Sequence, residues 1–511
     1  MKKTVIIISI IVASVYAVSA QNLWPSFDFK SANVEGDTLY YRITSTTTPT
    51  VAVTRCHDSV YHNLPFPTMP WEMGQSGFVY PLYDYDSYVV IPSTVEFEGQ
   101  TFTVTAIDKE AFYMQKNLQH VVLPNTIETI DTGAFHHSML NQIEMSSNVK
   151  RINFYAFSQI PLSSIELPES LTHIGVQAFA SSGIKEVNIP AGVSILPYQA
   201  FYSCPLTDIA FNDGLREIHE CAFSPEHIDT LAFPPSLVSI EQLTYDYLDD
   251  TIECRHVVFQ QGTEPLVIGK NCFQNFINLK TMVLPDNLVS VGPRCFSNTG
   301  LIEIDLPDGI DSISSNCFSY CESLDSVSLP SNLKRIEKLA FYETPMLKKI
   351  TIPQTVEYIG NSAFRSSLAR GLEEVNIFCE TPPSISPTTF NKQDTILVRV
   401  PCEKIDEYQA APVWNTYDNL VFEDCVGIEN VESGSCKVYP IPADKYINIE
   451  LDEFRSEYKI EIVNIYGQCV YGESLNSGKA SVDISSLSKG IYLINIFDKK
   501  GLLCSKKLIK A

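Results

Sequence analysis

The dipeptide Ala-Phe, or a close variant of it, recurs along the middle of this 511-residue chain at nearly constant spacing. Successive copies are 22 or 23 residues apart, except for steps of 28 before Phe273 and 26 before Phe390. A unit of this length cannot bury its own apolar side, so the copies must stack on one another. The aromatic residues that mark the copies are Phe112, Phe135, Phe157, Phe179, Phe201, Phe223, Tyr245, Phe273, Phe296, Phe318, Phe341, Phe364 and Phe390.

One copy of the repeat shows how its side chains alternate along the chain. Ile165 and Leu167 flank a polar residue, which is typical of a strand with one buried face. Pro168 has no backbone N–H and ends that strand, and the small Ala178 lets the chain turn closely while Phe179 fills the coil. We therefore predict a mainly β chain with a solenoid of about 12 coils of 22–23 residues.

The repeated unit Leu-x-x-Ile-x-Leu-Pro-x-x-Leu-x-x-Ile-x-x-x-Ala-Phe resembles the BspA-type leucine-rich repeat over roughly residues 101–422. Members of that family are bacterial surface proteins implicated in adhesion to host proteins, matrix or other bacteria. The resemblance implies a leucine-rich-repeat fold and the same broad role for this chain, with an extracellular protein or glycan as its ligand.

The segments on either side of the repeats read as caps. Residues 21–100 lack the repeat and contain strand-like runs, so we expect a β-rich N-terminal cap there. We expect the solenoid to cover residues 101–425, with a last strand over Ile396–Pro401. Apolar residues at Ile405, Tyr408, Ala411 and Trp414 then have near-helical spacing and predict an amphipathic capping helix, in which Trp414 is structural.

Residues 1–20 have the pattern of a secretory signal peptide, with a basic start, an apolar run and small residues before Gln21. No second apolar stretch of membrane-spanning length follows, so we expect no transmembrane segment in the mature chain. The net charge of −24 repels phosphate backbones, which argues against a nucleic-acid partner.

Residues 426–437 are acidic and small and read as a linker, and residues 438–511 alternate strand runs with turns, which predicts a small β-sandwich. This C-terminal part resembles the sorting domain of type IX secretion cargo, with Ile441 in place of the usual Asn. The resemblance implies export to the surface of a Gram-negative bacterium by the type IX machinery, with anchoring or release afterwards. The residues that carry it are Tyr439, Pro440, Pro442, Ala443, Gly467, Gly490 and Tyr492.

Motifs for catalysis are missing from the sequence. It contains no His-Glu-x-x-His, no paired Cys-x-x-Cys, no Gly-x-Ser-x-Gly and no phosphate-binding glycine loop. His136 and His137 follow Phe135, and we expect them to be exposed in a loop. We therefore predict no catalytic, cofactor-binding or metal-binding residues and a non-enzymatic protein.

The cysteines divide into two groups. Cys272, Cys295 and Cys317 take the place of the small Ala in successive copies, so we expect buried thiols. Cys379 and Cys402 lie two positions beyond the last inward strand residue of neighbouring coils, a spacing that fits a disulfide but does not require one. Cys425 and Cys436 flank the linker and are a second, weaker candidate pair.

Two features of the sequence suggest where a partner binds. The outward strand position is apolar in four central coils, at Ala210, Ala232, Val258 and Val283, and mostly polar or acidic in the flanking coils. Such a stripe fits a partner surface, although Val suits any strand and Ala is inert. The long step before Phe273 also contains an acidic and aromatic insertion, which is either a solvated loop or a contact for a cation or partner, at Tyr245, Tyr247, Asp249 and Asp250.

These observations favour a secreted or surface-displayed binding protein of the adhesin type. Two alternatives stay open at this point. One is an exported enzyme whose chemistry lies in residues 21–100 or in the insertion, and the other is an architectural component of a surface layer.

Overall fold

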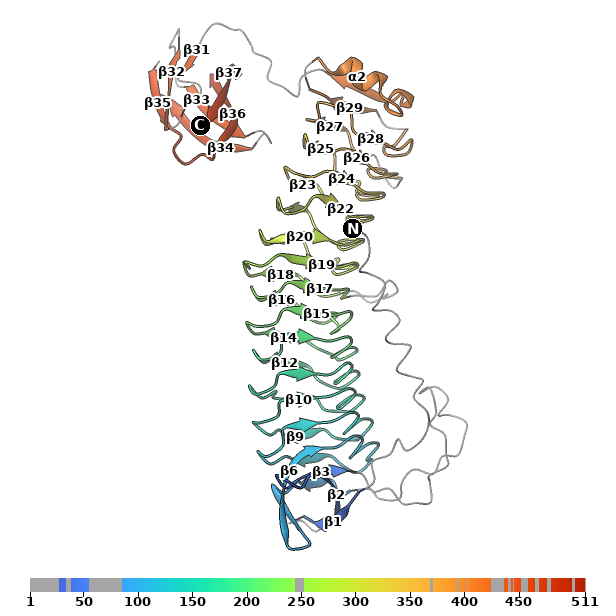
Figure 1. Cartoon of the computed structure of the whole chain (residues 1–511). Helices are drawn as coiled ribbons and strands as arrows, with labels where there is room; N and C mark the ends of the chain where they lie inside the picture. The colour runs from blue at the N-terminus through green and yellow to red at the C-terminus, as the bar shows by residue number, and fades with distance from the viewer. Residues whose placement is uncertain are drawn as a thin grey trace. The chain divides into compact units, whose positions relative to one another are not determined.

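The computed structural model describes residues 27–33, 38–54, 85–243, 252–367, 371–392, 395–401, 403–423, 436–439, 443, 445–451, 458–464, 468–475, 479–498 and 501–510. The chain divides into two compact units, Met1–Leu301 and Ile302–Ala511. The structure is mainly β, as predicted, and its solenoid has about 13 turns in all (Figure 1). The described residues contain no helix that is both long enough and apolar enough to cross a membrane.

The first unit begins with a β-rich cap, in agreement with the sequence. Strands β1, β2 and β3 form an antiparallel meander, and β5 pairs antiparallel with β6. The pairing changes to parallel where β3 meets β6, and it stays parallel through the coils that follow. The strands of the cap are β1 (Phe29–Ala32), β2 (Thr38–Ser45), β3 (Thr50–Thr54), β5 (Thr94–Phe97) and β6 (Gln100–Ile107).

Most coils of the first unit contribute short parallel strands to two sides of the stack (Figure 1). One side, which we call the front side, carries β4 (Tyr88–Val90), β7 (His120–Val122), β9 (Gln142–Glu144), β12 (Glu186–Ile189), β14 (Asp208–Phe211), β16 (Thr230–Phe233) and β18 (His256–Phe259). The return side carries β8 (Thr129–Ile130), β10 (Arg151–Ile152), β11 (His173–Ile174), β13 (Ile195–Leu196), β15 (Glu217–Ile218), β17 (Ser239–Ile240), β19 (Leu266–Ile268) and β20 (Leu288–Val291).

The alternation read from the sequence decides which side chains enter the core. In β12 and β16 exposed and buried residues alternate strictly, and the buried ones are aliphatic or aromatic. The strand predicted over Ile165 and Leu167 is an exception, because that coil forms no strand there. Ile165 is still buried whereas Leu167 is half-buried, so the coil keeps its inward residue without regular pairing.

The Ala-Phe residues form a ladder of rings through the core. The rings of Phe112, Phe135, Phe157, Phe179 and Phe201 stack in turn, with centroids 4.8–5.4 Å apart and planes within 7° of parallel. The backbone N–H of each Phe donates to the carbonyl of the Ala in the next coil, at 2.7–2.8 Å. The repeat therefore sets both the apolar core and the backbone bonds that join successive coils.

A second row of aromatic rings fills the core near the long step in the repeat. Phe211 stacks on Phe233, and Phe233 on Phe259, with centroids 5.8 and 5.0 Å apart. Phe259 then meets Phe273 edge to face at 6.3 Å, where the Ala-Phe ladder resumes. These three residues come from strand ends and not from the Ala-Phe position.

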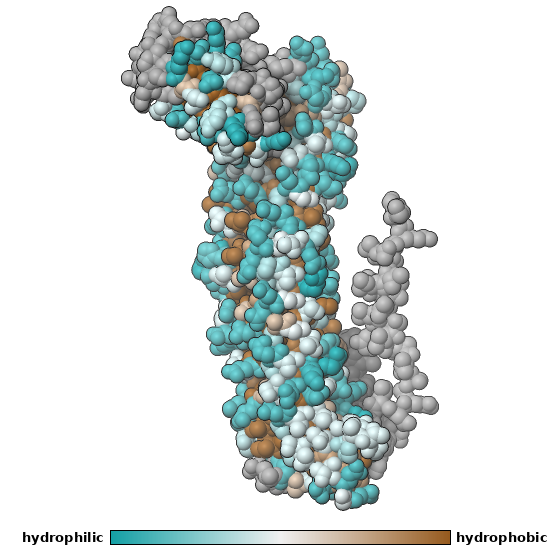
Figure 2. Space-filling view, turned by 60° about the vertical axis from the view of Figure 1, so that its left-hand side comes forward, coloured by the Kyte–Doolittle hydropathy of each residue, from teal (hydrophilic) through white to brown (hydrophobic). Residues whose placement is uncertain are grey.

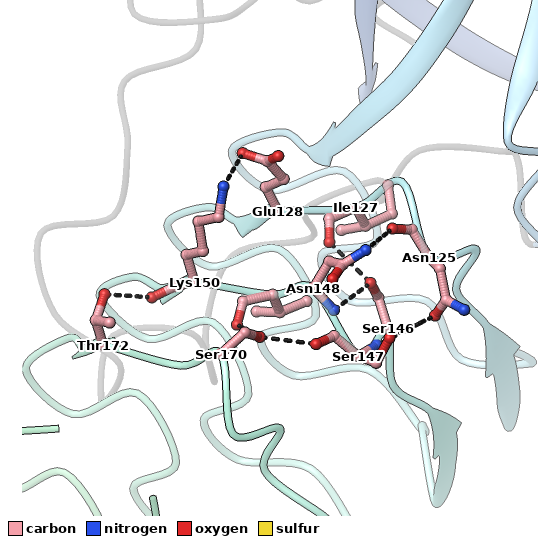
Figure 3. Close-up of polar contacts among 10 residues, drawn as sticks. Asn125, Ile127, Glu128, Ser146, Ser147, Asn148, Lys150, Ser170 and Thr172 are labelled. Atoms are coloured by element: carbon pink, nitrogen blue, oxygen red, sulfur yellow. Dashed lines mark hydrogen bonds and ion pairs between the residues drawn. The ribbon is translucent and has the colours of Figure 1, made fainter. Parts of the chain in front are cut away.

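Polar side chains join the coils at their outer turns, as in the early coils of the first unit (Figure 3). The Asn148 amide donates to the Asn125 carbonyl at 2.7 Å, and the Ser170 hydroxyl reaches the Ser147 carbonyl at 2.8 Å. Lys150 and Glu128 form an ion pair of 2.9 Å between adjacent coils. The two hydrogen bonds satisfy turn carbonyls that the parallel sheets leave unpaired.

The second unit repeats the same coil. Its front side carries β21 (Glu303–Asp305), β23 (Ser326–Ser328), β25 (Lys349–Ile352), β27 (Glu374–Ile377), β29 (Ile396–Arg399) and β30 (Leu420–Glu423). Its return side carries β22 (Ser312–Ile313), β24 (Arg335–Ile336), β26 (Tyr358–Ile359) and β28 (Ser384–Ile385). Here too the Phe rings stack, with centroids 5.2–5.9 Å apart from Phe318 to Phe390.

The end of the repeats differs in two ways from the prediction. The strand over Ile396–Pro401 is not the last, because β30 pairs parallel with β29 beyond it. The expected amphipathic helix stops early, as α2 (Ile405–Ala410), and a 3₁₀ turn, η3 (Trp414–Thr416), follows. Trp414 is buried, as a structural residue would be, and its indole N–H donates to the Pro383 carbonyl at 2.9 Å.

The C-terminal strands of the second unit form two antiparallel sheets around a separate core. One sheet contains β31 (Cys436–Tyr439), β32 (Tyr446–Leu451) and β35 (Lys479–Asp483). The other contains β33 (Tyr458–Asn464), β34 (Cys469–Leu475), β36 (Gly490–Asp498) and β37 (Gly501–Lys510). Aliphatic residues of both sheets, such as Ile447 and Ile494, are fully buried in one cluster, which is the architecture of a small sandwich.

Candidate functional site

The four apolar residues singled out in the sequence lie side by side in the first unit. Ala232 pairs in register with Val258, and Val258 with Val283. Ala210 lies one coil earlier on β14, whose Phe211 ring stacks on Phe233 of the next coil. We call this row the apolar stripe: Ala210, Ala232, Val258 and Val283.

The stripe points away from the core because its neighbours in the chain point inward. Ile209, Leu231, Val257 and Met282 are buried. The stripe residues between or beside them are open to solvent to differing degrees: Ala210 is half-buried, Ala232 is exposed, and Val258 and Val283 are 49% and 78% exposed. Val283 is thus a large aliphatic side chain held almost entirely in water, which is unfavourable unless something covers it.

Charged residues lie beside the stripe, and those at the strand starts change sign along it. Asp208 and Asp229 are exposed beside the alanine half, and Arg255 and Lys280 are exposed beside the valine half. The Arg255 guanidinium donates to Asp229 at 2.6 Å, in the middle of the row. Asp213 and Asp286, three residues beyond Ala210 and Val283, are also exposed, so carboxylates outnumber cationic groups beside the stripe.

The surface around this row is mostly polar. On the side toward the N-terminus, Glu144, Glu166 and Asn188 are exposed at the equivalent position, as the alternation predicts. Figure 2 shows one face of the molecule, on which hydrophilic residues predominate and apolar residues form small separate groups.

An aromatic contact at the start of the front side escaped the sequence analysis. Tyr88 is 42% exposed and meets the His120 ring edge to face, with centroids 4.8 Å apart. The run from Tyr88 to Pro92 lies within the segment expected to form the cap, whereas β4 pairs parallel with β7 as a coil strand does. The aromatic residue opening an otherwise aliphatic strand was the signal that could have revealed this contact.

The insertion at Tyr245, Tyr247, Asp249 and Asp250 lies outside the described residues. Its role as a loop contact stays a prediction. Among the residues that the structure describes, no group of three or more His, Cys, Asp or Glu side chains is arranged to hold a metal ion.

His136 and His137 are not the exposed loop pair that the sequence suggested. Both rings are half-buried, and the His136 ring lies against Tyr113 and Tyr155, with centroids 5.7 and 5.3 Å away. Burial and the neighbouring His137 lower the pKa of His136 to about 4, and burial lowers the pKa of His137. The sequence gave no sign of this, because the tyrosines come from the two adjacent coils.

The cysteines confirm one expectation and overturn another. Cys272, Cys295 and Cys317 are buried, as predicted, and Cys272 and Cys295 are free thiols. The bridge from Cys379 to Cys402 is wrong, because Cys379 is also a buried free thiol, and its Sγ lies 3.2 and 3.3 Å from the carbonyls of Pro353 and Val356. The Cys379 thiol therefore lies against the preceding coil. Cys402 and Cys425 lie outside the described residues, as does the side chain of Cys436, so that second pairing stays a prediction.

The residues of the sorting motif occupy different places in the sandwich. Tyr492 is buried and its hydroxyl donates to the Ser488 carbonyl at 2.9 Å, while Gly490 opens β36 opposite Lys510. Ala443 is buried and bridges Lys510, and the exposed Tyr439 hydroxyl donates to Glu450 at 2.9 Å. Pro440, Pro442 and Gly467 lie outside the described residues.

Comparisons with known families agree with both halves of this architecture. The model of the BspA type leucine rich repeat region matches in six copies, over residues 93–207, 184–255 and 245–370. The model of the secretion system C-terminal sorting domain matches residues 437–511. No curated protein matches the sequence.

Several solved structures are similar to this chain. A leucine-rich repeat protein from Bacteroides ovatus is 22% identical, with a TM-score of 0.49, and the match covers 78% of this chain and 100% of that one. The pneumococcal vaccine antigen PcpA is 18% identical, with a TM-score of 0.39 and coverage of 80% and 100%. A leucine rich cell surface protein from Faecalibacterium prausnitzii is 18% identical, with a TM-score of 0.33 and coverage of 65% and 90%.

Proposed function

Because this chain belongs to the BspA-type leucine-rich-repeat family and carries a type IX sorting domain, which make it a secreted or cell-surface protein, we propose that it binds an extracellular partner through the apolar stripe. The partner is a protein, a glycan or another cell. The single observation that carries the proposal is the register of Ala232, Val258 and Val283, which the β16–β18 pair and one isolated bridge hold side by side.

The physical argument begins with the cost of the exposed side chains. Covering a valine is worth about 25 cal/mol per Å² of apolar surface removed from water, so Val258 and Val283 favour any partner that fits them. Polar and charged residues, such as Asp229 and Arg255, border the row as the polar rim of an interface does. Parallel strands on a stacked core also hold the row rigidly, which lowers the entropic cost of binding.

The test uses beads coated with the purified chain, offered to immobilised matrix proteins, glycan arrays and bacterial cells. We expect capture by at least one of these surfaces and a loss of at least tenfold in the variant Val258→Glu/Val283→Glu. The matched control is Ile195→Glu, which places the same charge at a side chain that is 41% exposed on β13, on the return side.

Two outcomes would overturn the proposal. If the double variant binds as the original chain does, the stripe is not the binding site. If no surface captures the chain while its deletion alters the cell envelope, an architectural role replaces binding. Turnover of protease or glycosidase substrates, abolished by a point change in residues 21–100, would instead establish an enzyme.

A further inference from the structure

We propose that the partner of the apolar stripe is the same stripe on a second copy of this chain, with the two coil stacks antiparallel about a two-fold axis. This inference rests on the proposed function, because it names the partner of the same face. It is drawn from two gradients along the stripe, one of side-chain size and one of charge.

Side-chain size increases along the stripe. It begins with the half-buried Ala210 and the exposed Ala232, and it ends with the protruding Val258 and Val283. An antiparallel second copy sets Ala210 opposite Val283, and Ala232 opposite Val258. Each large side chain then meets a small one, which allows close packing, whereas a parallel copy would set valine against valine and leave a gap between the alanines.

At the starts of the strands, the charged residues beside the stripe reverse sign in the same direction as side-chain size increases. Asp208 and Asp229 flank the alanine half, and Arg255 and Lys280 flank the valine half. A two-fold axis parallel to the strands keeps each residue's position along its strand and reverses only the order of the coils. Asp229 of one copy therefore lies opposite Arg255 of the other, and the reverse contact forms as well.

The axis passes between the coils of Ala232 and Val258, where Asp229 and Arg255 already form an ion pair of 2.6 Å within one chain. Pairing two copies would arrange two aspartates and two arginines in a ring of alternating charge. Both side chains are more than half exposed, at 55% and 65%, so they are free to reorient toward a second chain.

The area of the apolar stripe limits how strongly two copies of the chain can associate. Four coils at about 4.8 Å and four strand residues at about 3.3 Å give a patch of roughly 250 Å² per copy. Stable interfaces bury about 800 Å² per partner, so this pair belongs to the weak class. Weak pairs become effective when many copies face each other, as on two cell surfaces that display the chain.

Sedimentation equilibrium of the full purified chain tests the inference. We expect the average mass to rise from monomer toward dimer between about 10 and 500 µM, the range of a weak association. Val258→Glu should abolish the rise, and Ile195→Glu should leave it unchanged. A chain that stays monomeric at every concentration would overturn the inference.

Exchanging the charges of Asp229 and Arg255 distinguishes an ion pair between two chains from the ion pair within one chain. Asp229→Arg and Arg255→Asp each break the internal ion pair and place like charges across the axis, so each variant alone should associate at least tenfold more weakly. Mixing the two variants restores opposite charges across the axis, and we expect heterodimers to form. A mixture that stays monomeric would contradict the antiparallel arrangement.

The outcomes for the inference and for the proposed function are distinguishable. If the chain stays monomeric while Val258→Glu/Val283→Glu loses capture of matrix or glycan, the stripe binds another partner and the homotypic inference fails alone. If the chain dimerises through the stripe while the same variant captures those surfaces normally, the proposed site for them fails and the inference stands.

Discussion

Arg42 and Asp108 join the N-terminal cap to the first coil through two parallel hydrogen bonds of 2.7 Å each. Arg42 lies on β2, and Asp108 follows β6 with its side chain only 4% exposed. The bond to Asp108 is the main reason that the pKa of Arg42 is raised. A planar guanidinium and a carboxylate meet here in the bidentate geometry that fixes the relative position of two elements.

The first prediction concerns this pair. Arg42→Met should lower the free energy of unfolding by about 2–4 kcal/mol, because it leaves a buried carboxylate without its charged partner. Arg42→Met/Asp108→Asn should recover part of that loss, and urea denaturation followed by circular dichroism measures both. A single variant as stable as the original chain would show that the pair does not hold the cap in place.

The second prediction concerns the ring ladder. Phe179 is fully buried, with stacked rings on both sides, so Phe179→Ala should cost about 3–5 kcal/mol of stability. Phe179→Leu should cost less, because it refills most of the cavity. The exposed Ile195 supplies the control, since Ile195→Ala removes a side chain that the core does not use. The midpoint of thermal unfolding should be lowest for Phe179→Ala, higher for Phe179→Leu and highest for Ile195→Ala.

The third prediction concerns pH. The pKa of His136 is about 4 in the folded chain and about 6.5 when unfolded, so between these values the unfolded chain binds the extra proton. The contribution of the neutral His136 ring to the free energy of unfolding should therefore be complete above about pH 6.5. It should fall by up to about 3 kcal/mol as the pH drops toward 4. His136→Phe should reduce this dependence in urea titrations at pH 7 and pH 5.

The fourth prediction concerns the free thiols. Burial raises the pKa of Cys272 and Cys295 well above its usual value, so neither forms the reactive thiolate in the folded chain. Alkylation followed by peptide mass spectrometry should label the exposed Cys469 rapidly and the two buried cysteines only after unfolding. Rapid labelling of Cys272 would contradict its place in the core.

The fifth prediction concerns export. Removing residues 438–511 should leave the protein inside the outer membrane, because the type IX machinery would lose the domain that it recognises. Cell fractionation with an antibody against the repeats measures the distribution. Normal surface display of the shortened chain would contradict the role of this domain.

Much of the fold followed from the repeat. The spacing of the Ala-Phe copies predicted the stack, and the alternation within each copy predicted that Val258 and Val283 point outward while Val257 and Met282 point inward. The alternation of strand runs and turns in residues 438–511 predicted a small sandwich, and Tyr492 is buried in its core. These features depend on residues close together in one copy or one strand, so periodicity is enough to reveal them.

Other features depend on contacts between coils, which no single copy contains. Gln177, Gln199 and Cys221 precede the Ala in their coils and have φ between 50° and 54°, a region that such residues rarely adopt. The stacked turns impose it, because the N–H and carbonyl groups there bond to adjacent coils, as from Gln177 to the Tyr198 carbonyl at 3.1 Å. Their identities gave no hint of this.

The sequence by itself determined the coil, its length and which face of each strand is buried. Successive side chains of a strand point to opposite faces, and the same apolar positions recur in every copy of the repeat. The tertiary structure alone decided that Phe211, Phe233 and Phe259 form a second row of rings, that Cys379 stays a thiol, and that β30 extends the sheet. It also aligned Ala232, Val258 and Val283 across steps of unequal length. Register between coils depends on how each insertion is accommodated, and that depends on packing and not on spacing along the chain.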